Sequence, residues 1–403
     1  MTDVVADVQY NKRGNKMSCK IFKLGETVIS KHTRLFLGEN SCNRNIQTYH
    51  DSKYPWILAF AEELRSIGNW SKNEIDLSKE KTDFDGLSEA GRHIYEAGLK
   101  FAITLDSCAG RAPLQLFNNG GISNNPEWEL YITNHQNNEL LHSEAYTEMV
   151  RAVYNDVDEF IENIINDEHI QRRATSILSN FDQATAIFDK MDANKICENN
   201  GKERPFPEVG EKEVKEAIYK SALVLNIFEG IRFFATFITN WSFSEQPTKL
   251  MQGSSNIFKL IARDEMIHLD IFQRILKMLK TDESEGFVQT AANLEDETYE
   301  LFKTTLQEEM EWIEYLFSQG SPLIGMNGNI LKDYMEYIFA IRMTNIGLDP
   351  TKIGLQLKDN PVPWVNNYLD SSNVKSAPQE IESVNYVAAI DSSKDEDISF
   401  DDL

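Results

Sequence analysis

The stretch LVLNIFEGIRFF, residues 223–234, decides the fold class of this chain. Its apolar residues recur with helical spacing and do not alternate with polar ones, which is typical of a helix buried inside a helical bundle. Glu229 and Arg232 are the charged residues of this stretch. Because a buried carboxylate without a partner is energetically costly, Glu229 needs a cation, which Arg232 or a bound metal ion could supply.

Helical spacing continues on both sides of this stretch, from about Tyr54 to Asn345. Alternation that would predict strands is scarce, and several segments exceed about 20 residues, a length typical of bundle helices. The sequence therefore predicts an all-α helical bundle. The expected helices span residues 88–105, 126–153, 170–190, 211–241, 256–279, 294–317 and 330–346.

The two ends of the chain differ from this helical part. Residues 1–50 mix basic residues with Asn, Gly and Ser without a sustained period, which predicts a loosely structured N-terminal arm. We expect residues 51–346 to form the helical domain and residues 347–375 to form a loop segment that packs on it. Residues 376–403 lose apolar periodicity and end in a run of acids, which predicts a flexible acidic tail.

Composition and charge narrow the possible functions. The chain has 403 residues, and its 64 acidic against 40 basic residues give a net charge of −24, which argues against binding to nucleic acid or anionic lipid. The cysteines form no CxxC pair, which favours a reducing compartment. No signal-peptide pattern is present, and charged residues interrupt the most apolar stretch, so we expect a cytoplasmic protein that does not span a membrane.

Two pairs of glutamate and histidine have the spacing of metal ligands. Glu139 precedes His142 by three residues, and Glu265 precedes His268 by three residues, each pair within an expected helix. Residues at this spacing project from one face of a helix, so each pair could place an oxygen and a nitrogen on one metal ion.

Two further carboxylates, Asp106 and Glu229, lie in strongly apolar helices. Asp106 could instead be a polar residue at the end of a helix, and Glu229 could pair with Arg232. Taken together, however, four helices supply one carboxylate each and two of them add a histidine, which is the ligand set of a dinuclear carboxylate site in a four-helix bundle. Oxygen-rich ligation without thiolates favours iron or manganese over structural zinc.

Tyr146 follows His142 by four residues, so its ring should lie one turn further along the same helix face. Phe233, Phe237 and Ile261 lie one or two turns from Glu229 and Glu265 and could surround that ring with apolar side chains. A phenol in such a place could be oxidised and then protected from quenching. Alternatively, Tyr146 is an ordinary core tyrosine that forms a hydrogen bond.

In these residues and in the motifs around them, the sequence resembles the small, radical-generating subunit of class I ribonucleotide reductase, of the tyrosyl-radical type. The resemblance runs from about Leu35 to Leu403. Its motifs are LKFAITLDS (99–107), ELLHSEAYT (139–147), EGIRF (229–233), LIARDEMIHL (260–269), NPVPWVN (360–366) and APQEIESVNYV (377–387).

The resemblance implies a ferritin-like bundle with additional helices and a site for two iron ions, or manganese, that is activated by dioxygen. Within this family pattern, one ion would be bound by Asp106, Glu139 and His142, and the other by Glu229, Glu265 and His268. Tyr146 would hold the radical.

The resemblance also implies a route for electrons and protons toward a large subunit. Trp70 matches the family's surface-to-core tryptophan, and Asp264 matches the aspartate that links it to a metal-bound histidine. Tyr386 and Glu380 match residues of a tail that docks on the large subunit and relays the radical. A homodimer that reduces ribonucleotides only together with the large subunit is expected.

Two positions depart from the family pattern. His135 stands where an aromatic residue usually precedes the first glutamate ligand by four positions, and it could form a hydrogen bond to a ligand or compete as one. The residues around Trp70, GNWSKN (68–73), replace more aromatic and proline-containing surroundings. Two other functions are compatible with the ligands alone: a diiron oxygenase or oxidase of the same fold, and a ferritin-like iron-binding protein without enzymatic activity.

Overall fold

The computed structural model describes residues 34–38, 47–50, 52–108, 110–118 and 121–369. Within these ranges every regular element is a helix and there is no strand, so the predicted all-α fold is confirmed. The N-terminal arm up to residue 33 and the tail from residue 370, including Glu380 and Tyr386, lie outside the described residues.

The main helices are long, and most begin near the residues that the sequence predicts. Helix α5 spans the expected residues, with Pro126 at its first turn. Helix α7 begins earlier than predicted because Asp167 caps it, accepting hydrogen bonds from the backbone N–H groups of His169 and Ile170. The α-helices are α1 (Pro55–Ile67), α2 (Glu80–Gly86), α3 (Glu89–Cys108), α4 (Ala112–Phe117), α5 (Pro126–Val153), α6 (Val157–Ile165), α7 (Glu168–Asn199), α8 (Glu211–Ile227), α9 (Phe234–Ser244), α10 (Gln252–Thr281), α11 (Val288–Asn293), α12 (Glu295–Leu316), α13 (Gly328–Asn345) and α14 (Asn366–Leu369).

The prediction of one continuous helix over residues 211–241 is wrong in one respect. A π-helical segment, Phe228–Arg232, separates α8 from α9 and carries Glu229. Gly230 within this segment lies against α10, where a Cβ atom would come 2.6 Å from Cδ1 of Leu269. A π-bulge inserts an extra residue into a helix and changes which side chains face the core, an effect that local apolar spacing does not reveal.

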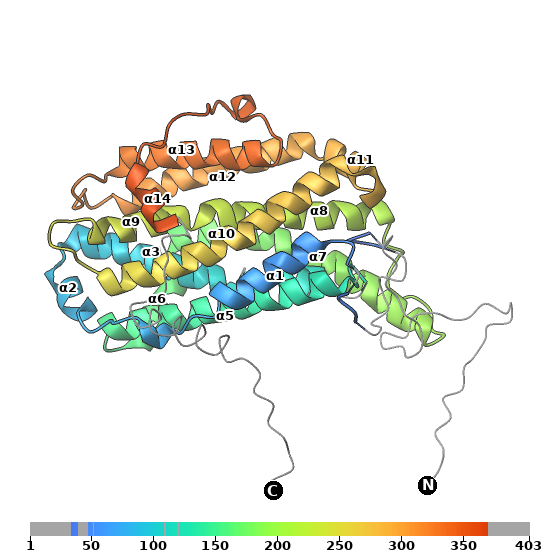
Figure 1. Cartoon of the computed structure of the whole chain (residues 1–403), viewed down its shortest axis with the longest axis horizontal. Coiled ribbons are helices and arrows are strands. Elements are labelled where there is room, and N and C mark those ends of the chain that lie inside the picture. The colour runs from blue at the N-terminus through green and yellow to red at the C-terminus, as the bar shows by residue number, and fades with distance from the viewer. Residues whose placement is uncertain (1–33, 39–46, 51, 109, 119–120, 370–403) are drawn as a thin grey trace, which may run out of the picture.

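Helices α3, α5, α8, α9 and α10 and the π-helical segment pack together at the centre of the bundle. Helix α3 packs against α5 and α9, and α10 packs against α8, α9 and the π-helical segment. Helix α1 lies beside α5, and Figure 1 shows α12 and α13 running together along one side of the bundle. At the C-terminal end of the described chain, the Tyr368 ring stacks on Trp241 at 4.7 Å.

The longest apolar stretch of the described chain lies in the core of the bundle. Among the described residues, the stretch Glu211–Ser244 is long and apolar enough to cross a membrane, with a mean hydropathy of 1.5 over its most apolar window. All of that window is buried inside the bundle. Core helices of soluble proteins pass the same test, so the stretch is weak evidence for a membrane span.

A buried ion-pair network settles the partner of Arg232. Its Nη1 lies 2.8 Å from Oε1 of Glu309 on α12, and its Nη2 contacts Glu308. Arg173 of α7 donates to the same Glu309 carboxylate at 2.5 and 3.0 Å, and to the backbone oxygen of Arg232 at 2.8 Å. Arg232 therefore pairs with α12, and the alternative that it neutralises Glu229 is wrong.

The network predicts a large stability loss when its shared acid is removed. Replacing Glu309 by alanine leaves Arg173 and Arg232 buried with Glu308 as their remaining acid, so we expect Glu309→Ala to lower the free energy of unfolding by about 3–5 kcal/mol in urea denaturation. The control is Asp85→Ala, which removes an exposed partner of Lys81 at 2.7 Å and should cost about 1 kcal/mol or less. Equal losses of unfolding free energy in the two variants would contradict the role of Glu309 as the shared acid of a buried network.

Candidate metal centre

Six predicted ligands come together in the middle of the bundle, although they lie far apart in the sequence. Each is at most 2 % exposed. Helix α3 supplies one carboxylate, α5 and α10 supply one carboxylate and one histidine each, and the π-helical segment supplies the last carboxylate. These residues are Asp106, Glu139, His142, Glu229, Glu265 and His268.

The first group of candidate ligands surrounds His142. Its Nδ1 lies 3.2 Å from Oε1 of Glu265 and 3.7 Å from Oδ2 of Asp106. Oε2 of Glu139 is also 3.7 Å from this nitrogen. One atom from each of these four residues falls within 4.8 Å of the others, a spacing that suits a single metal ion.

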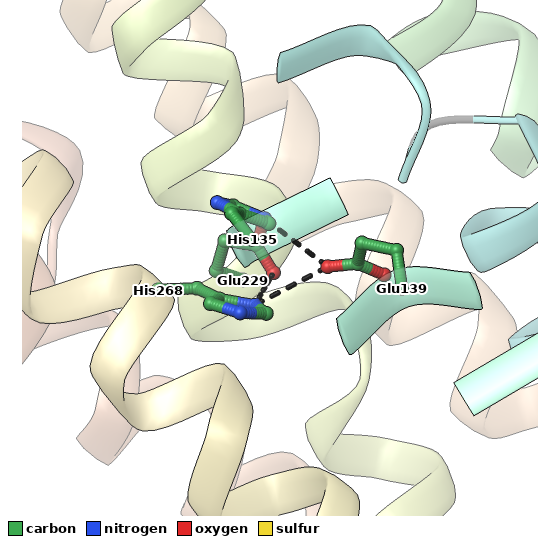
Figure 2. A group of neighbouring side chains, drawn as sticks. All are labelled: His135, Glu139, Glu229 and His268. Carbon is green, nitrogen blue, oxygen red and sulfur yellow. Dashed lines mark hydrogen bonds and ion pairs between the residues drawn. The ribbon is translucent and has the colours of Figure 1, made fainter. Parts of the chain in front are cut away.

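The second group, shown in Figure 2, surrounds His268. Its Nδ1 lies 3.2 Å from Oε1 of Glu139 and 3.9 Å from Oε2 of Glu229. His135 belongs to this group as well, with its Nε2 3.1 Å from Oε1 of Glu139. The family pattern singled out His135 as a residue that could form a hydrogen bond to a ligand or compete as one, and the structure places its ring directly among the candidate ligands.

Glu139 and Glu265 each face both groups. Glu139 directs Oε2 toward His142 and Oε1 toward His268. Glu265 directs Oε1 toward His142 at 3.2 Å and Oε2 toward His268 at 3.1 Å. The resemblance assigned one of these glutamates to each ion, and in the structure each glutamate faces the histidines of both groups.

The electrostatics of the cluster fit cations. Among the described residues, both oxygens of Asp106, both oxygens of Glu229, Oε2 of Glu139 and Oε1 of Glu265 are buried without a hydrogen-bond partner. Such oxygens are costly to bury unless a cation binds them. Carboxylate and imidazole donors without sulfur are a combination that iron and manganese accept. The residues therefore fit a dinuclear centre of these metals.

The pKa values of the cluster reflect crowding of buried acids. Burial, and then repulsion by neighbouring glutamates, raises the pKa of Asp106 and of Glu229 well above the ordinary range. Burial alone would also raise the pKa of Glu265, but hydrogen bonds from His142 and His268 lower it to about 2. Burial opposes protonation of His268, yet hydrogen bonds to Glu139 and Glu265 raise its pKa to about 9.

Tyr146 lies one helical turn beyond His142 and is fully buried. Burial raises its pKa well above the usual value, and Asp106 is the charged group with the largest further effect. Its ring packs on Phe258 of α10 at a centroid distance of 5.9 Å. Sequence reasoning missed Phe258, although this residue precedes the predicted Ile261 by one turn on the same helix.

The three predicted apolar neighbours of Tyr146 are all buried. Phe237 packs on Phe258 at 5.8 Å and stacks on Phe233 at 5.6 Å. Phe258 thus contacts both the Tyr146 ring and the phenylalanine cluster, and the predicted direct packing of Phe233, Phe237 and Ile261 on Tyr146 stays a prediction.

Trp70 connects to the cluster through Asp264. The indole Nε1 donates to Oδ2 of Asp264 at 2.8 Å, and the same oxygen lies 3.4 Å from Nε2 of His142. Trp70 is 6 % exposed, and its ring is inclined by 24° to that of His142 at 6.4 Å. The structure therefore brings together the tryptophan, aspartate and histidine that the sequence pattern paired.

Two glycines allow these close approaches. A Cβ atom on Gly110 would lie 2.7 Å from Oε2 of Glu139, and one on Gly68 would lie 2.5 Å from Nδ2 of Asn138. The Asn138 amide donates to the Gly68 oxygen at 2.6 Å, just before Trp70. Neither glycine was expected from the sequence to permit a close approach, because contacts between distant segments leave no local spacing pattern.

The helices and the buried acids define a helical-bundle protein with the ligand set of a dinuclear metal centre. Comparison with known proteins gives the family. The profile described as "Ribonucleotide reductase, small chain" matches residues 47–351. The chain therefore belongs to the ribonucleotide reductase small-chain family, and the resemblance seen in the sequence is confirmed.

Curated relatives and solved structures agree with this family. The chain is 35 % identical over 359 residues to ribonucleoside-diphosphate reductase 1 subunit beta of Escherichia coli O157:H7, covering 88 % of this chain and 92 % of the relative. It is 34 % identical over 375 residues to the subunit beta of Haemophilus influenzae, covering 92 % and 95 %. The ribonucleotide reductase R2 subunit from Clostridium botulinum has the same fold, with a TM-score of 0.65 and 23 % identity over 80 % of this chain and 91 % of that one. An R2-like ligand-binding oxidase also shares the fold, with a TM-score of 0.53 and 16 % identity over 72 % and 93 %.

Metal loading should strengthen as the pH rises. The raised pKa values of Asp106, Glu229 and His268 favour their proton-bound forms, and a metal ion must displace those protons. Because binding releases protons, affinity should increase by about tenfold per pH unit for each proton released. Titration with Mn²⁺ between about pH 6 and pH 8, together with proton release in weak buffer, measures this effect. Affinity that does not change with pH would contradict it.

Proposed function

We propose that this chain is the radical-generating small subunit of class I ribonucleoside-diphosphate reductase. The observation that carries the proposal is the position of Tyr146, buried one turn from His142 and under the electrostatic influence of Asp106. An iron-binding protein or a substrate oxidase would need the carboxylates and histidines, but not a shielded phenol at this place.

In this proposal, Asp106, Glu139, His142, Glu229, Glu265 and His268 bind two iron ions, with manganese as the alternative metal. The chemistry that such a dinuclear centre supplies with dioxygen is the one-electron oxidation of a phenol. The chain itself binds the ions, keeps water away and positions Tyr146. The raised pKa of Tyr146 keeps the phenol protonated, so loss of its electron must be accompanied by loss of its proton.

The proposal extends to the route by which the oxidising equivalent leaves the site. Trp70 and Asp264 would conduct electrons and protons between His142 and the surface, supported by the hydrogen bond of 2.8 Å between them. Tyr386 and Glu380 would continue the route in a tail, residues 376–403, that docks on the large subunit. We further propose a homodimer that works in the cytoplasm and reduces ribonucleotides only with that large subunit.

The radical assignment predicts that Tyr146→Phe abolishes the tyrosyl signal in electron paramagnetic resonance after iron and oxygen are added. Metal binding and the unfolding temperature should change little, because the ring and its packing on Phe258 are kept. The matched control is Tyr334→Phe on α13, a similarly buried tyrosine, which should keep the signal. An unchanged signal in Tyr146→Phe would contradict the assignment of the radical to Tyr146.

The relay predicts a different phenotype for the tail. In the full-length chain, Tyr386→Phe should form the Tyr146 radical normally but support no measurable ribonucleotide reduction when mixed with the large subunit. Tyr368→Phe is the control, since Tyr368 donates to Glu245 on the bundle and lies outside the proposed route. Normal turnover by Tyr386→Phe would show that the radical leaves by another path.

A further inference from the structure

His135 is a fully buried histidine that the proposed ligand set does not use. It lies one turn before Glu139 on α5, and its Nε2 is 3.1 Å from Oε1 of Glu139 and 3.3 Å from Oε1 of Glu229. Its other ring nitrogen, Nδ1, is 3.3 Å from the hydroxyl of Tyr131. The ring faces two carboxylates of the second group (Figure 2). Its Nδ1 side faces the buried phenol of Tyr131.

The orientation of the ring argues against direct metal ligation. The imidazoles of His135 and His268 are stacked at 3.7 Å and inclined by only 12°. An imidazole nitrogen binds a metal ion along its lone pair, which lies in the ring plane. Two nearly parallel stacked rings cannot both direct in-plane lone pairs at one ion between them. Nδ1 of His268 lies within 3.9 Å of three carboxylates, those of Glu139, Glu229 and Glu265. Nε2 of His135 faces two carboxylates, so His268 is the better placed of the two as a ligand.

The groups that face the two ring nitrogens set the tautomer of His135, because the carboxylate oxygens at Nε2 can only accept a hydrogen bond. A neutral imidazole has one N–H donor and one acceptor nitrogen, and the partner of one nitrogen decides the role of the other. Tyr131 is fully buried, and donating its hydroxyl proton to Nδ1 satisfies both groups. The His135 proton is then on Nε2, which faces Glu139 and Glu229.

We propose that His135 is a positioning residue that donates from Nε2 to the carboxylate of Glu139 and holds Glu139 and Glu229 in the orientation that the second metal ion requires. The donor places partial positive charge beside two carboxylates that otherwise repel each other. Tyr131 acts through His135 by fixing its tautomer. This inference rests on the proposed dinuclear centre and adds a residue that selectively strengthens one of its two positions.

The test is a Mn²⁺ titration of the full-length protein, in which two sites are resolved by the electron paramagnetic resonance of free and bound ions. Removing an outer hydrogen-bond partner of a ligand typically weakens metal affinity by about 10–100-fold. We expect His135→Phe, which keeps a ring but removes the donor, to show this loss at one site and a smaller loss at the other, because Glu139 faces both groups. His135→Gln keeps an N–H donor and should recover most of the affinity, and Tyr131→Phe should cause a smaller loss at the same site.

Three results would overturn the inference: two normal sites in His135→Phe, equal losses in His135→Phe and His135→Gln, or a crystal structure of the Mn²⁺-loaded protein with Nε2 of His135 at a bonding distance of about 2.1 Å. If His135→Phe fails to fold, as judged by circular dichroism, His135→Gln is compared with Tyr131→Phe. The inference then requires near-normal affinity in His135→Gln and weaker binding at one site in Tyr131→Phe, and normal binding in Tyr131→Phe would overturn it. Failure of the dinuclear centre itself is distinguishable, because the wild-type protein would then not bind two ions.

Discussion

Mutual repulsion among four carboxylates buried in one small volume is the constraint on which the rest of this structure depends. Asp106, Glu139, Glu229 and Glu265 come from four elements, and each is shielded from water. Helices suit this task because they satisfy their own backbone hydrogen bonds, so a rigid frame can direct acids inward without also burying unpaired amides. The buried carboxylates at the centre of this frame require positive charge. His142 and His268 neutralise only part of their negative charge.

Arg232, which could neutralise Glu229, pairs with acids outside the cluster. In a regular α-helix, residues three apart share a face, and Arg232 would lie close to Glu229. The π-helical segment has more residues per turn and rotates Arg232 away, toward Glu308 and Glu309 on α12. The structure therefore has two separate charged networks. The arginines and glutamates of the first, Arg173, Arg232, Glu308 and Glu309, neutralise one another and connect helices. The carboxylates of the second remain available to bind metal ions.

The sequence predicted those parts of the centre that depend on local spacing. The pairs Glu139–His142 and Glu265–His268, and the position of Tyr146, follow from the period of an α-helix, which applies before any tertiary contact is known. The π-helical segment, Phe258 and Gly110 were not predicted, because they depend on how closely two helices approach. The position of Glu139 and Glu265 between His142 and His268 likewise depends on how α5 and α10 face each other. The roles of Glu380 and Tyr386 rest on the family resemblance, since the described residues end before them.

The two candidate ligand histidines differ in the groups behind them, which would make the halves of a dinuclear centre chemically unequal. Nε2 of His142 faces the Asp264 carboxylate, whereas Nε2 of His268 has no hydrogen-bond partner among the described residues. A carboxylate behind an imidazole makes it a stronger electron donor to a metal ion. Ions at the two positions would therefore differ in reduction potential, with the higher oxidation state favoured beside His142. Two ions of the same element would thus differ in reduction potential, and the ion that is more easily oxidised would lie on the side of Trp70.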